Sequence, residues 1–107
     1  MPTKVLPFTA VQPGGARQIS FPLHEHTVNA SHVGALLEAL LDSITKEIHA
    51  NQDVSDGDVL QAVCMALAIR MHLVEAPPDA VRAMVAATLE QADDAVAESI
   101  VQPAGQA

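Results

Sequence analysis

The most apolar stretch of the chain runs from Asp58 to Val74, where 13 of 17 residues are apolar. Neither proline nor glycine interrupts it, so the stretch predicts a helix. A helix that is apolar on nearly every side is buried in its own subunit, or is shared between that subunit and another. We therefore expect the remaining elements to be organised around this helix.

Two flanking stretches each carry one apolar stripe at three- and four-residue steps, which is typical of amphipathic helices. Asn29 and Ser55 precede two of the predicted helices at positions that favour N-caps, and Asp58 lies three residues after Ser55, as in a capping box. Pro77 and Pro78 separate the second helix from the third. The predicted helices span 30–50, 56–75 and 78–100.

The first part of the chain, residues 4–23, has the alternating pattern of β-strands. Ile19, Phe21 and Leu23 lie on one face of the second predicted strand, and a Pro13-Gly14 pair fits a type II turn. The segment predicts a β-hairpin, with an extended arm that grips a neighbouring subunit as the alternative. Pro7 and Pro22 each remove a backbone donor, so neither strand is expected at the centre of a sheet.

Together these elements predict a mainly α fold, an antiparallel three-helix domain with an N-terminal β-hairpin or extended arm. The class becomes α+β if the hairpin is formed. The short loops between the helices favour antiparallel neighbours. We expect one domain over residues 1–100 and a disordered tail over 101–107.

The middle helix offers more apolar surface than two single-stripe helices can cover. A homo-oligomer, with a two-fold homodimer as its simplest form, would bury the remainder. The predicted interface residues combine small, apolar and charged side chains of the middle helix. They are Met65, Ala68, Arg70 and His72.

Composition excludes several classes of partner. The net charge is −8, from 13 acidic and 5 basic residues, so neither nucleic acid nor an anionic membrane is an expected partner. The acidic surface maintains solubility, and an inhibitor that mimics nucleic acid toward a basic protein is one alternative. No apolar run reaches the roughly 18 residues of a membrane span. The single cysteine, Cys64, gives no sign of an oxidising compartment, so we expect a cytoplasmic protein.

Candidate chemistry is sparse. His24 and His26 alternate as on a strand and His32 is near in sequence, which makes these three the candidate metal ligands, although a zinc site requires three or four ligands and no further His or Cys cluster accompanies them. Cys64 and His72 lie roughly 12 Å apart along one helix, too far for a nucleophile and its base. We therefore predict no catalytic residue, no metal and no cofactor.

The function that follows is a non-catalytic, homo-oligomeric protein–protein interaction domain, with a second protein as a further candidate partner. Two alternatives stay open. One is binding of a small ligand or metal by the region of His24, His26 and His32, or by Arg70, which emerges from an apolar surface. The other is the acidic inhibitor.

Overall fold

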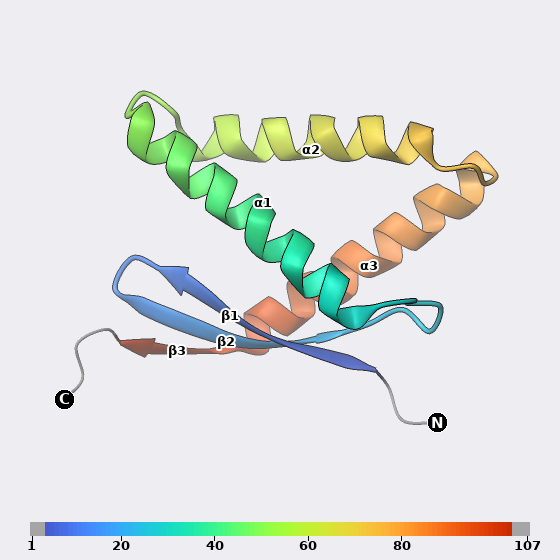
Figure 1. The fold of residues 1–107 in the computed structure, drawn as a ribbon, viewed down its shortest axis with the longest axis horizontal. Helices are drawn as coiled ribbons and strands as arrows, with labels where there is room; N and C mark the ends of the chain where they lie inside the picture. The colour runs from blue at the N-terminus through green and yellow to red at the C-terminus, as the bar shows by residue number, and fades with distance from the viewer. Residues whose placement is uncertain (1–3, 104–107) are drawn as a thin grey trace. The chain divides into compact units, whose positions relative to one another are not determined.

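The computed structural model describes residues 4–103, which form three strands and three helices in the order ββαααβ (Figure 1). These residues divide into two compact units. The sheet unit comprises 4–34 and 86–103, and the helical unit comprises 35–85. The elements are β1 (Val5–Gln12), β2 (Gly15–Pro22), α1 (Ala30–Ala50), α2 (Asp56–Leu73), α3 (Pro78–Glu98) and β3 (Ile100–Pro103).

The strands form one antiparallel sheet in the order β1-β2-β3 (Figure 1). The hairpin expected over residues 4–23 is present, and its register pairs Val5 with Pro22 and Gln12 with Gly15. The expectation that neither of its strands is central was wrong, because β2 lies between the other two. Strand β3 pairs only with residues 15–18 of β2. Pro22 lies beyond that pairing, so its missing N–H leaves the β2–β3 ladder intact.

The third strand also corrects the predicted end of the domain. Residues 100–103 form β3, whereas helix had been expected to residue 100 and a disordered tail from 101. The rest of that predicted tail, 104–107, lies outside the described residues. Helix α3 ends at Glu98, so Ile100 belongs to a strand and not to the apolar stripe of a helix.

Two adjacent glycines shape the hairpin turn for different reasons. Gly14 has φ +86°, which the third position of a type II turn requires. Glycine is needed at position 15 because a Cβ there would overlap the carbonyl oxygen of Gln102 in β3. Gly14 therefore permits the turn, and Gly15 leaves space for β3 to pair with β2.

The sheet unit contains the one buried apolar side chain among the described residues, Ile19 of β2, which is 6% exposed. Across the hairpin the rings of Phe8 and Phe21 lie 6.4 Å apart, centroid to centroid. Arg17 of β2 is half-buried, and its Nη1 donates hydrogen bonds to the carbonyl oxygen of Val96 (3.1 Å) and to Ser99 Oγ (3.0 Å). The guanidinium thus satisfies the carboxyl end of α3, where cations interact favourably with the helix dipole.

Each helix of the chain begins at a recognisable signal. Asn29 Oδ1 accepts a hydrogen bond from the backbone N–H of His32 at the start of α1. Ser55 and Asp58 form a capping box at the start of α2. The second helix nevertheless ends at Leu73, two residues before its expected end, with Val74 already in an extended conformation.

The predicted bundle is absent. No two helices pack along their lengths within the described residues 4–103, so the antiparallel three-helix domain was wrong and the fold is α+β with a three-stranded antiparallel sheet. In the helical unit, the end of α1 and the start of α2 meet only around the 51–55 loop, and α2 and α3 meet around 74–77. A short loop brings two helix ends together but does not set the angle between the helices. That angle follows from which surfaces are buried.

Candidate functional site

The surface of α2 is the outstanding feature of the helical unit, because none of its residues is buried. Exposure extends to every side of the helix: Leu60 is 66% exposed, Met65 57% and Leu73 61%, and these residues lie about 80–140° apart around the helix. Cys64, which the sequence places inside a buried helix, is exposed as well. An apolar surface of this extent on one helix is unusual for a monomeric protein and is typical of an interaction site.

The four predicted interface residues do not share one face of α2. At about 100° per residue, Met65, Ala68 and His72 fall within about 60° of one another. Arg70 lies about 140° from Met65 around the helix. We call the first side the Met65 face, formed by Asp58, Gln61, Met65, Ala68 and His72. We call the other side the groove face, formed by Val63, Leu67, Arg70 and Val74.

The groove face borders two apolar grooves of the helical unit. One groove of about 410 Å³ lies between the last turns of α2 and the first turns of α3, and Arg70 and Leu67 line it together with Met84. The other, of about 380 Å³, lies where α1 ends and α2 begins, and Val63 lines it together with Ile44. Of the Met65 face, Asp58 lines the groove between α1 and α2, whereas Gln61, Met65 and Ala68 at its centre line neither groove.

Sequence reasoning did not anticipate these grooves. A signal for one of them lies on either side of Ser55, because Val54 and Val59 have the spacing of a hydrophobic staple and both line the groove between α1 and α2. What the pattern could not give was the open angle between the helices, which leaves a groove where a bundle would have a core.

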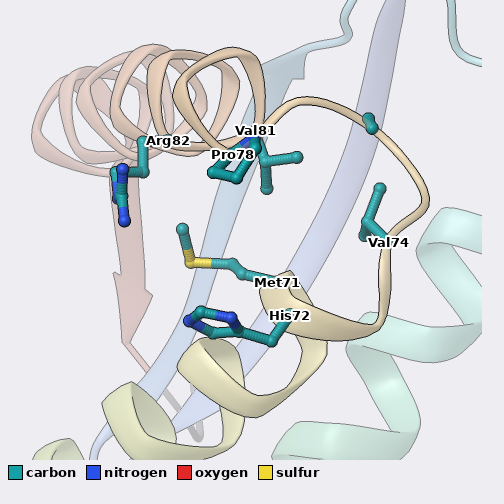
Figure 2. Close-up of a pocket in the computed structure, with 7 residues that line it drawn as sticks. Met71, His72, Val74, Pro78, Val81 and Arg82 are labelled. Carbon is teal, nitrogen blue, oxygen red and sulfur yellow. The ribbon is translucent and has the colours of Figure 1, made fainter.

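A smaller cavity of about 80 Å³ lies at the junction of α2 and α3. Figure 2 shows Met71 and His72 of α2 on one side of it, with Pro78, Val81 and Arg82 of α3 on the other. Arg82 is engaged nearby, since its Nη1 donates to Asp79 Oδ1 at 3.2 Å. His72 is therefore the residue of the Met65 face that lies nearest to α3.

Charge is distributed unevenly along α2. Asp56 and Asp58 occupy the first turn, and Arg70 and His72 the last turn, which complements the helix dipole at both ends. Among the described residues 4–103, Arg70 forms no ion pair.

The histidines proposed as metal ligands lie in the sheet unit. The rings of His24 and His26 are 5.1 Å apart, centroid to centroid, and His24 Nδ1 accepts a hydrogen bond from the backbone N–H of His26. His32 lies in the first turn of α1. Within residues 4–103 no group of three or more His, Cys, Asp or Glu side chains has an arrangement that could hold a metal ion.

Similarity to other proteins adds no information about the site. No family model, curated protein or solved structure matches the chain. In the part of the chain that the structure describes, no helix is both long and apolar enough to cross a membrane. The surface of α2 is therefore interpreted from its own residues.

Proposed function

We propose that this protein is a non-catalytic interaction domain that works as a homo-oligomer, most simply a two-fold dimer, through the apolar surfaces of its helices. The observation that carries the proposal is the exposure of those surfaces. None of the residues in α1, α2 or α3 is buried. Large apolar side chains are exposed on each helix, among them Leu36 (65%), Leu40 (62%), Leu73 (61%) and Leu89 (65%).

The energetic argument follows from this exposure. Ordering a residue costs about 1–2 kcal/mol of backbone conformational entropy, and folded chains offset that cost mainly by removing apolar surface from water. Each Å² of apolar surface buried contributes roughly 25 cal/mol. The helices described here bury little of theirs within one subunit. A second subunit would supply the missing burial.

The charges agree with a protein partner. The net charge of −8 disfavours nucleic acid and anionic membranes as targets. The acidic and basic residues of α2 lie at its ends, which leaves its apolar middle free for contact with protein. We place this activity in the cytoplasm, where an exposed free thiol such as Cys64 persists in the reduced state.

Native mass spectrometry of the untagged protein at micromolar concentration tests the proposal, because it reports subunit number and bound mass together. We expect a peak at twice the subunit mass with no additional mass. A monomer at this concentration would overturn the proposal. A subunit that carries a stoichiometric non-covalent mass would favour the metal- or ligand-binding alternative in its place.

A further inference from the structure

We propose that two copies of the chain pair through the Met65 faces of α2, antiparallel about a two-fold axis at Met65, with Asp58 of each copy facing the partner's His72. This inference rests on the proposed function and specifies its geometry. The partner that covers the Met65 face is the same face of a second copy of this chain. The argument uses the spacing of the face, its charges and the sizes of its side chains.

The spacing of the Met65 face is symmetric about its centre. Asp58, Met65 and His72 follow one another at intervals of seven residues, which keeps them within about 40° on one side of the helix. Asp58 and His72 each lie about 10.5 Å from Met65 along the axis, in opposite directions. A two-fold axis that passes beside Met65, perpendicular to α2, generates an antiparallel second helix. In this pair each Asp58 lies at the same level as the partner's His72.

The remaining layers of the same register are also compatible. Gln61 comes to the level of the partner's Ile69, and Ala62 to the level of the partner's Ala68. The alanine layers on either side of Met65 permit two helix axes to approach to about 8 Å, the lower end of the normal range. The flexible Met65 side chains can adapt to each other at the axis itself. An isologous contact of this kind satisfies both copies with one surface.

Charge complementarity favours this orientation over the parallel one. A parallel pair would place the Asp58 side chains of the two copies beside each other. The antiparallel pair places each Asp58 beside the partner's His72, and it also sets the two helix dipoles in opposition. Asp58 has the capacity for a second contact: Oδ2 accepts the backbone N–H of Ser55 at 3.2 Å, and Oδ1 has no hydrogen-bond donor within residues 4–103.

An 18-residue helix is about 27 Å long, so the α2 pair alone gives a small interface. The α2 pair sets the register of the contact.

Disulfide trapping tests the register directly, and the chain is suited to it because Cys64 is its single cysteine. In a Cys64→Ala background, Met65→Cys places the new thiol on the axis, next to its own copy in the partner. Disulfides form when the two Cα atoms are about 4.4–6.8 Å apart. We expect mild oxidation to convert most of this variant to a covalent dimer on a non-reducing gel.

Two matched controls define the face. Leu67→Cys in the same background lies on the groove face, about 160° from Met65, and should stay at least tenfold less cross-linked. The unmodified protein, whose Cys64 lies about 100° from Met65, should also cross-link poorly. Efficient cross-linking of Leu67→Cys with none at Met65→Cys would overturn the proposal.

A second pair of variants tests the register by a different route. Asp58→Cys and His72→Cys, each in the Cys64→Ala background, should not cross-link alone, because identical residues seven positions from the axis lie about 21 Å apart along the helix. Mixed together, they should form a covalent heterodimer. Self-cross-linking of either variant in place of the heterodimer would overturn the antiparallel register.

Native mass spectrometry of the same samples under reducing conditions separates the two proposals. If the variants remain dimeric but cross-link in the wrong pattern, the register is wrong and the proposed function stands. If the protein is monomeric, both proposals fail. Circular dichroism at 222 nm verifies that each variant keeps the helix content of the parent.

Discussion

The sheet unit and the helical unit differ in whether apolar side chains are buried within the subunit. In the sheet unit, Ile19 is buried and Arg17 connects β2 to the end of α3 through two hydrogen bonds. Leu6 of β1 lies close to Gly34 of α1, where an added Cβ would lie 3.3 Å from Leu6 Cδ1. In the helical unit, residues 35–85, no side chain is buried and no hydrogen bond links one helix to another. One unit finds its contacts within the chain, and the other presents its apolar side chains to solvent.

This difference in burial shows which contacts form within a single subunit. A sheet brings strands together through backbone hydrogen bonds, so even a four-residue strand such as β3 is placed by its ladder. Helices satisfy their own backbone groups and associate only through side chains. A helix without a packed neighbour is complete in hydrogen bonding and incomplete in burial.

Ile19→Ala should lower the free energy of unfolding by about 3 kcal/mol, because it removes most of a buried side chain and leaves a cavity. Urea titration followed by circular dichroism measures the effect. Ser20→Ala, on the exposed face of the same strand, is the matched control and should change stability by less than about 0.5 kcal/mol. Equal effects of the two substitutions would show that Ile19 is not part of a core.

Met65→Asp should weaken self-association by about 30-fold, or about 2 kcal/mol, since it places a charge at the centre of the proposed α2 contact. Analytical ultracentrifugation over a concentration series gives the dissociation constant. Val11→Asp in β1 is the control: Val11 is 87% exposed, more than Met65, yet it lies in the sheet unit. If both variants weakened association equally, the assignment of assembly to the helical unit would be contradicted.

Arg17→Met should cost about 1.5 kcal/mol of stability, because the hydrogen bonds to Val96 and Ser99 are lost while the length of the side chain is retained. The loss should not depend on protein concentration, because these contacts lie within one subunit. Thermal unfolding at two concentrations separates this effect from that of Met65→Asp. Arg82→Met, whose ion pair with Asp79 is exposed, should cost less than about 0.5 kcal/mol.

Local signals in the sequence predicted local structure well. The caps at Asn29 and Ser55 are confirmed by their hydrogen bonds. The alternation around Ile19 identified the buried face of β2. Each of these predictions depends on residues a few positions apart, and therefore on geometry that is the same in any protein.

Predictions that required distant contacts were less successful. Ile100 continues the apolar stripe of α3 in sequence, and only its pairing opposite Gln18 shows that it belongs to a strand. Pro22 on its own indicates that β2 is not a central strand, but β3 pairs only with residues 15–18 of β2, so Pro22 lies outside that pairing. On α2, the spacing places Arg70 about 140° from Met65, but only the structure shows that Arg70 lines a groove together with residues of α3. A pattern identifies apolar positions but not the element that covers them.

Residue spacing alone was enough to predict where the three helices and the N-terminal hairpin begin, which strand face is apolar, and that α2 carries apolar residues on all sides. These properties follow from backbone geometry and residue spacing, which act over a few residues. The tertiary structure alone decided that a third strand completes the sheet, that β2 is central and that the helices do not form a bundle. Those outcomes depend on contacts between residues far apart in the chain, where small differences in burial select one arrangement from many that the same pattern allows.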